Sequence, residues 1–168
     1  MPDQETMDRA RKDAEEGKSP STQAGEFVRE EMHHIREGEH GASSTKQAIA
    51  IGLSKARRAG VKLGVPAKGS VSTETRRKAE QDLRTGRSSR RRKPSATRSR
   101  AVTRALRKKG RSAASSQSLS RQARSSARKR GASARHEAAV KAVRTKGKEG
   151  LRAEARKAAA TRERRRAA

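Results

Sequence analysis

The strongest constraint on this chain is the scarcity of large apolar side chains after Pro66. Residues 67–168 contain no aromatic residue and only eight large aliphatic ones. Ordering the backbone costs roughly 1–2 kcal/mol per residue, whereas burying a Leu or Val returns about 1.5–3 kcal/mol. We therefore predict that this part has no core of its own and is a long tail, disordered or transiently helical. The eight aliphatic residues are Val71, Leu83, Val102, Leu106, Leu119, Val140, Val143 and Leu151.

The charge of the chain divides at the same point. Residues 1–66 carry eleven Lys and Arg and eleven Asp and Glu, whereas residues 67–168 carry 34 and seven, so the whole net charge of +27 lies in the tail. A polycation of this density binds polyanions, and nucleic acid releases condensed counterions when its phosphates are neutralised. The alternative is a solvated charge run without a dedicated partner. We expect a nucleic-acid-binding tail joined to a charge-neutral head.

Arg outnumbers Lys in the tail by 24 to 10. The planar guanidinium group presents a fork of donors that fits phosphate oxygens. No recognition helix on a packed scaffold is apparent, so we expect phosphate contact without base readout. The residues predicted to bind nucleic acid are Arg76, Arg77, Lys78, Arg90, Arg91, Arg92, Lys93, Arg104, Arg107, Lys108, Lys109, Arg128, Lys129, Arg130, Arg162, Arg164, Arg165 and Arg166.

Several function classes lack their sequence signals. The chain has no cysteine, Trp or Tyr, and Phe27 is its only aromatic residue, so thiolate chemistry and extended base-stacking platforms are excluded. Neither a phosphate-binding GxxxxGK[ST] loop nor a G-x-S-x-G nucleophile motif is present. We predict that the protein is not an enzyme and uses no cofactor. The charged N-terminus and the lack of a long apolar stretch predict a cytoplasmic protein without a membrane span.

The phrase HHIREGEH contains three histidines and two glutamates: His33, His34, Glu37, Glu39 and His40. His33 and Glu37 are four residues apart, which would place them on one face of a helix. The HExxH order of a zinc protease is missing, and a glycine interrupts the segment. We interpret it as a polar helix end followed by a loop and predict no metal site.

The head has the patterning of short helices. Residues 3–16 read as a polar helix, and residues 20–37 carry one apolar stripe that ends at Gly38. A second apolar helix is predicted over 45–59, begun by a Ser44–Gln47 capping box. The short connection favours a helical hairpin. The side chains predicted to form the head core or a protein-interaction surface are Phe27, Val28, Met32, Ile35, Ile49 and Leu53.

Two further features belong to the second of these helices. Gly52 lies in its middle, where Gly costs about 1 kcal/mol relative to Ala, and close approach of the neighbouring helix would explain it. Lys55, Arg57 and Arg58 lie near its end. These cations either contact phosphate or simply complement the helix dipole, and both interpretations remain open here.

Good helix formers in the tail alternate with Gly, Ser and Pro. Five segments are candidates for transient helices: 73–85, 97–109, 119–130, 134–146 and 151–166. The separating residues are Gly86, Pro94, Gly110, Gly131, Gly147 and Gly150.

The block SPSTQAGEFVREEMHHIREGEHGASSTKQAIAIGLSKARRAGVKL, residues 19–63, resembles a family of small basic bacterial proteins of unknown function. The phrase STKQAIAIGLSKARRAG at 44–60 carries most of the resemblance. It implies a bacterial, cytoplasmic protein and assigns no activity. The tail resembles linker-histone tails in composition, although it is richer in Arg and lacks Ser-Pro-Lys-Lys repeats.

The sequence thus predicts an all-α protein. Residues 1–66 form a head of two or three short helices, and residues 67–168 form the basic tail. The expected function is sequence-nonspecific binding and compaction of DNA by a histone-like, nucleoid-associated protein, with the head available for self-association or a protein partner. One alternative is an RNA-binding or ribosome-associated protein, and another is a stress-response or interaction protein.

Overall fold

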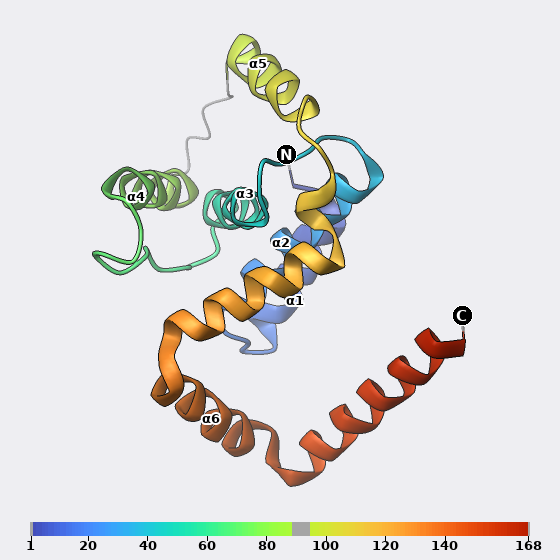
Figure 1. Ribbon diagram of the computed structural model, residues 1–168. Coiled ribbons are helices and arrows are strands. Elements are labelled where there is room, and N and C mark those ends of the chain that lie inside the picture. Colours follow the sequence, from blue (N-terminus) through green and yellow to red (C-terminus); the bar gives the residue numbers. More distant parts are fainter. Residues whose placement is uncertain (1, 89–94, 168) are drawn as a thin grey trace. The chain divides into compact units, whose positions relative to one another are not determined.

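The structure, a computed structural model, describes residues 2–88 and 95–167, except for the side chain of Arg165. It divides into two compact units, Met1–Gln122 and Ala123–Ala168. Apart from an isolated bridge between Lys68 and Val71, the regular structure of the described residues is helical, so the all-α prediction is confirmed (Figure 1). The elements are α1 (Gln4–Glu15), α2 (Pro20–Glu37), α3 (Thr45–Arg58), α4 (Thr73–Arg87), α5 (Ala96–Arg107), the short 3-10 helix η1 (Ser112–Ala114) and α6 (Ser116–Ala167).

Helix α2 begins and ends as its sequence predicts. Pro20 occupies the first turn, where its missing N–H costs nothing. Gly38 ends the helix in the left-handed conformation, with φ of 88°. Helix α1 packs against α2, and the Arg9 Nε lies 2.8 Å from Glu26 Oε2. The polar helix predicted over residues 3–16 therefore forms by pairing with α2.

The predicted helical hairpin consists of α2 and α3. Ser44 caps α3 by accepting a hydrogen bond from Gln47 N, whereas the Gln47 side chain accepts from Ser43 N at 2.7 Å rather than from the cap residue. A Cβ atom placed on Gly52 would lie 2.7 Å from the Cα atom of Val28. The close approach expected at Gly52 is confirmed, because the α2 backbone occupies the space of a side chain.

The first unit contains two small apolar clusters. One surrounds Phe27, which is 1% exposed, and includes the buried residues Ala10, Ala24, Ala56 and Val61. The other contains Met32, Ile35, Ala42, Ala48, Ala113 and Ala114. The second cluster is therefore completed by two alanines that lie far beyond Pro66.

Two segments beyond Pro66 pack onto the head. Helix α4 packs against α3, and a Cβ atom on Gly86 would lie 2.0 Å from the Arg57 carbonyl oxygen. The end of α5 and the segment after it contact the α2–α3 connection, because Gly41 N donates to the Leu106 carbonyl oxygen at 3.0 Å and Ala42 N donates to the Gly110 carbonyl oxygen at 3.3 Å. We placed the domain boundary at Pro66 from charge and composition, whereas the first compact unit extends to Gln122.

The tail is helical rather than disordered in its described residues, which corrects our prediction. Helix α6 reaches Ala167 and is interrupted at Gly131 (φ 78°, ψ 174°) and Gly147 (φ 67°, ψ 174°). No described residue of 123–168 is buried. The error came from counting burial alone. A helix satisfies its backbone locally, and Ala, Arg, Lys and Glu favour it without any core.

Candidate nucleic-acid interface

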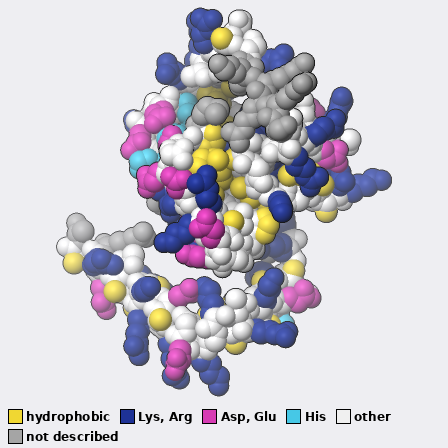
Figure 2. Space-filling model, turned by 180° about the vertical axis from the view of Figure 1, so that it is seen from behind, with side chains coloured by type: hydrophobic (Ala, Val, Ile, Leu, Met, Phe, Trp, Pro, Cys, Tyr) yellow, Lys and Arg dark blue, Asp and Glu magenta, His cyan; other side chains and the backbone are white. Residues whose placement is uncertain are grey.

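The second unit is a strongly cationic helical segment. Residues 123–168 contain sixteen Lys and Arg and four Glu. Every Lys and Arg side chain that the structure describes there belongs to an exposed residue. In the space-filling view, Lys and Arg side chains project across the visible face of the molecule rather than from a single patch (Figure 2). Exposure on several sides suits contact with a continuous phosphate surface better than a single pocket.

The predicted phosphate-binding residues of α6 whose side chains the structure describes form no ion pair there. Arg128, Lys129 and Arg130 immediately precede the break at Gly131, and the cluster at the C-terminal end contains Arg162, Arg164 and Arg166. All six are exposed, and among the described residues none of the six forms an ion pair with an acidic group. No acidic group of the described residues therefore neutralises their charges. The side chain of Arg165 lies outside the described residues.

The cluster at the end of α5 has the same character. Arg104, Arg107, Lys108 and Lys109 are exposed, and within the part of the chain that the structure describes they have no acidic partner within salt-bridge distance. The cluster Arg90, Arg91, Arg92 and Lys93 lies outside the described residues, so its prediction stays untested.

The α4 cluster differs, because two of its three cations have partners within the chain. Arg76 donates to the Pro66 carbonyl oxygen at 3.0 Å and to Glu80 Oε1 at 3.2 Å. Lys78 Nζ lies 3.0 Å from Glu74 Oε1, and Arg77 is exposed without such a pair among the described residues. Exposed pairs of this kind contribute little energy, so they can open when a phosphate competes.

The cations near the end of α3 have internal partners. Lys55 Nζ lies 2.8 Å from Glu30 Oε1 and 3.0 Å from Glu31 Oε2. Burial favours the neutral amine of Lys55, but the two carboxylates outweigh it and raise the pKa above the usual lysine value. These contacts explain Lys55 without phosphate.

The two arginines that follow are also held within the chain. Arg57 is 7% exposed and donates to the Gly64 carbonyl oxygen at 3.2 Å. Burial lowers the pKa of its guanidinium group, and the charge of Asp82 partly opposes that shift. Arg58 Nε lies 3.6 Å from Asp82 Oδ1. Neither arginine therefore needs a phosphate to explain its position.

The predicted core or interaction residues of the head lie inside the first unit. Phe27, Met32 and Ile35 are buried, and Val28, Ile49 and Leu53 pack partly buried against the two clusters. The face around Met32 and Ile35 is covered by Ala113 and Ala114 of the same chain. Sequence patterning missed this covering segment, because two alanines between polar residues form no apolar stripe.

Two backbone contacts hold the covering segment in place. Thr45 Oγ1 donates to the Ala113 carbonyl oxygen at 2.7 Å, and Arg36 Nε donates to the Ala114 carbonyl oxygen at 2.9 Å. Both side chains come from the hairpin formed by α2 and α3. Ala113 and Ala114 therefore pack as part of the head, although they lie in the range of residues that we assigned to the tail.

Residues 19–69 match DUF6496, a family of unknown function. The match begins just before α2 and ends between α3 and α4, so it covers the hairpin and leaves out α5 and α6. It agrees with the resemblance to an uncharacterised family over residues 19–63. No helix among the described residues is long and apolar enough to cross a membrane. No curated protein and no solved structure gives a significant match to the chain.

Proposed function

We propose that this protein binds DNA without sequence specificity as a histone-like, nucleoid-associated protein. The observation that carries the proposal is the exposed positive charge of the tail, because the described arginines and lysines of the α5 end and α6 clusters have no acidic partner. Phosphates would supply the missing counter-charge, and release of condensed cations from DNA would provide the free energy.

The shape of the tail supports phosphate contact rather than base readout. In residues 123–168 no described side chain is buried, so nothing fixes the helix against a scaffold that could hold one face toward the base edges. The guanidinium groups are distributed around and along the helix, and they can reach phosphates on adjoining strands or duplexes. Neutralisation of several phosphates at once would compact DNA.

The first 66 residues contribute no net charge to this activity. Their cations near the end of α3 form internal pairs, and their apolar face is covered by Ala113 and Ala114. The head therefore serves as a folded anchor at one end of the cationic tail. On this proposal, DNA affinity depends on the tail charges and is insensitive to equal changes of charge in the head.

Two matched triple variants test this division in the full chain. The tail variant is Arg162→Gln, Arg164→Gln and Arg166→Gln, and the head variant is Arg11→Gln, Arg29→Gln and Lys62→Gln, all at exposed positions. Both remove three charges. Fluorescence anisotropy with a labelled duplex should show that the slope of log K against log salt becomes shallower by about 2–3 in the tail variant alone. Equal changes in the two variants would show that only net charge matters and would contradict the proposed interface.

RNA is the second candidate, and the excess of Arg over Lys in the tail, 24 to 10, favours it. Arginine-rich segments bind structured RNA well, and guanidinium planes also stack on unpaired bases. Competition against the labelled duplex separates the candidates. Unlabelled duplex DNA should displace the protein at lower phosphate concentration than a structured RNA or anionic liposomes. The reverse order for RNA would replace DNA with RNA as the partner.

A further inference from the structure

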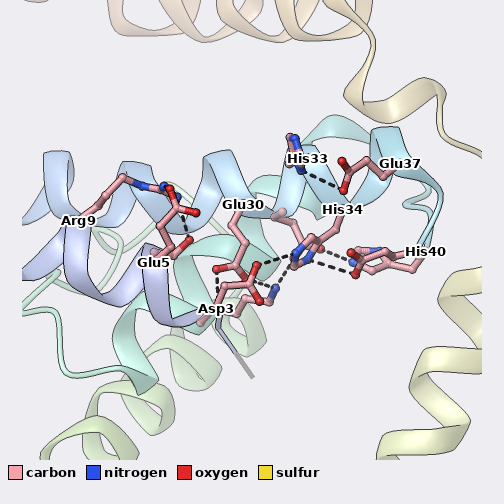
Figure 3. Close-up of polar contacts among 12 residues, drawn as sticks. Asp3, Glu5, Arg9, Glu30, His33, His34, Glu37 and His40 are labelled. Carbon is pink, nitrogen blue, oxygen red and sulfur yellow. Dashed lines mark hydrogen bonds and ion pairs between the residues drawn. The ribbon is translucent and has the colours of Figure 1, made fainter.

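A cluster of titratable side chains that the proposed function does not use lies in the first unit. Helix α2 provides Glu30, Glu31 and His34, the connection to α3 provides His40, and Asp3, the residue just before α1, joins them. One ligand atom from each of Glu31, His34 and His40 lies within 4.8 Å of the others, and the same holds for Asp3, Glu30 and His34. Figure 3 shows His34 with Asp3 and His40 on either side.

The carboxylate of Glu31 is the least satisfied polar group of this cluster. Glu31 is 0% exposed, and neither of its oxygen atoms has a hydrogen-bond partner of good geometry. Its Oε2 lies 3.0 Å from the Lys55 ammonium group, and its Oε1 faces His40 Nε2 at 3.4 Å. A buried carboxylate normally has its lone pairs satisfied, so Oε1 is aimed into the cluster with capacity left for a cation.

The histidines are oriented as metal ligands are. His40 Nδ1 lies 3.3 Å from the Gly41 carbonyl oxygen, and donation of its proton there leaves the Nε2 lone pair facing Glu31. Such a second contact fixes the tautomer and orientation of many metal-bound imidazoles. His34 Nε2 lies 3.1 Å from Asp3 Oδ2. Both histidine side chains are mostly buried, with exposures of 15% and 13%.

Glu30 is already engaged and therefore does not compete for the same role. Its Oε1 lies 2.8 Å from Lys55 Nζ, and its Oε2 accepts from the backbone N of Asp3 at 3.1 Å. This second bond positions the Asp3 carboxylate beside His34. Two imidazoles, the buried Glu31 and Asp3 are left to face one another, and the exposed Glu39 lies beside them with its Oε2 3.7 Å from His34 Nδ1.

We propose that Glu31, His34 and His40, completed by Asp3, form a binding site for one zinc ion. Two imidazole nitrogens with carboxylate oxygens are a common zinc ligand set, and hard cations such as Mg²⁺ prefer oxygen alone. The Lys55 ammonium group stays in contact with Glu30 and with Oε2 of Glu31, and it compensates part of the negative charge of the carboxylates. This site joins the N-terminus, α2 and the connection before α3, so the ion would stabilise the head.

Sequence spacing pointed to a different set of residues in the same segment. His33 and Glu37 form an exposed pair, with Nδ1 3.0 Å from Oε2, and they lie on another face of α2 from the cluster. Glu31 and Asp3 were not candidates at all. His33 therefore provides a control that differs from His34 by a single position in the sequence.

Isothermal titration of tag-free full-length protein with ZnCl₂ tests the site, with MgCl₂ as the control ion. One Zn²⁺ should bind per chain, and Mg²⁺ should not compete for that site. His34→Gln and His40→Gln should each weaken Zn²⁺ binding by about 10-fold or more, whereas His33→Gln should leave it unchanged. Absence of stoichiometric binding, or equal losses in all three histidine variants, would overturn the proposal.

Two carboxylate variants and a spectroscopic probe keep the test independent of folding. Asp3→Asn alters an exposed side chain and Glu31→Gln keeps the shape of a buried one, and both should lower Zn²⁺ affinity. Circular dichroism compares the helicity of each variant with that of the parent chain. Bound Co²⁺ should show the visible absorption of a four-coordinate site, and this absorption should be lost in His40→Gln. Unchanged Zn²⁺ affinity in a folded Asp3→Asn variant would remove Asp3 from the site.

Discussion

The hydroxyl group of Thr45, at the first position of α3, donates a 2.7 Å hydrogen bond to the carbonyl oxygen of Ala113. The two residues are 68 positions apart, and both are buried. The contact satisfies a backbone carbonyl inside the second apolar cluster, where an unpaired polar group would be costly. The folded head thus depends on a segment that charge and composition assign to the tail.

Ala114 is the position at which this dependence can be measured. It is 0% exposed, so Ala114→Leu would force side chains or backbone apart, and we expect a loss of about 1–3 kcal/mol in the free energy of unfolding. The exposed Ala158 provides the matched control, and Ala158→Leu should change stability by less than about 0.5 kcal/mol. Urea unfolding followed by circular dichroism gives both values. If Ala114→Leu leaves the free energy of unfolding unchanged, the segment around Ala113 and Ala114 does not pack on the head in solution.

Truncation tests the same relationship without a substitution. A chain of residues 1–122 keeps both apolar clusters, whereas residues 1–66 lack Ala113, Ala114 and α4. The longer chain should therefore unfold cooperatively at a clearly higher temperature. Thermal unfolding monitored at 222 nm measures the two midpoints. Equal midpoints would show that the head folds independently at Pro66.

Phe27→Ala should be the most damaging truncation of a single side chain in the first unit. Phe27 is 1% exposed and lies among Ala10, Ala24, Ala56 and Val61, which are too small to fill the cavity. Such substitutions cost about 3–5 kcal/mol, a large part of the stability of a small domain. Val102→Ala, at a residue that is 52% exposed, should have little effect. DNA affinity should persist in Phe27→Ala, since the tail charges are intact.

Two glycines within helices should respond in opposite directions to alanine. Gly52→Ala places its Cβ atom 2.7 Å from Val28 Cα, so it should destabilise the chain by about 1–3 kcal/mol. Gly25, inside α2, has nothing within 4 Å of the same position. Gly25→Ala should therefore stabilise the protein by about 0.5–1 kcal/mol through helix propensity. Denaturant unfolding of both variants measures the difference, and a change of the same sign in both would contradict the packing of α3 on α2.

Lys55→Met should destabilise the first unit because it leaves buried Glu31 without its cation. Removing one partner of a buried pair costs about 3–5 kcal/mol, and Glu31→Gln in the same chain should recover part of the loss. The pKa of Lys55 is raised in the folded state. The contribution of the Lys55 charge to the free energy of unfolding is therefore complete below the pKa of an unfolded lysine, about 10.4. It is lost as the pH rises through the pKa of Lys55 in the folded state.

The pH dependence can be isolated by comparing the parent chain with Lys55→Met. The difference in their free energies of unfolding should stay constant between neutral pH and about pH 9, and it should shrink above about pH 10.4. Other groups that titrate at high pH affect both chains alike and cancel. A difference that grows with rising pH would contradict the raised pKa.

Sequence reasoning was most successful where one residue decides a local outcome. The stop at Gly38, the cap at Ser44 and the close approach at Gly52 all follow from backbone chemistry that one residue controls. The breaks at Gly131 and Gly147 were predicted for the same reason. Gly86 and Gly150 were also expected to interrupt helices, but they lie within α4 and α6, because Gly reduces helix stability without preventing helical dihedrals.

The failures concern contacts between distant parts of the chain. The burial of Ala113 and Ala114, the packing of Gly86 on Arg57, and the meeting of Asp3 with His34 depend on three-dimensional proximity that no local pattern encodes. The tail helices were expected to be only transient for another reason, because a core was treated as a requirement for lasting regular structure. Helix propensity acts residue by residue and needs no such core.

The glycine breaks in α6 also determine how far the positive charge can extend in one direction. An uninterrupted α6 would be a rod of about 78 Å, since a helix rises 1.5 Å per residue. Gly131 and Gly147 divide it into stretches of roughly 22–30 Å, each shorter than the ~34 Å of one turn of duplex DNA. A straight helix of full length would touch a curved duplex over only a short part of its length. On the proposed function, a break within the length of each turn of the duplex would let successive clusters of arginine stay against a bent phosphate backbone.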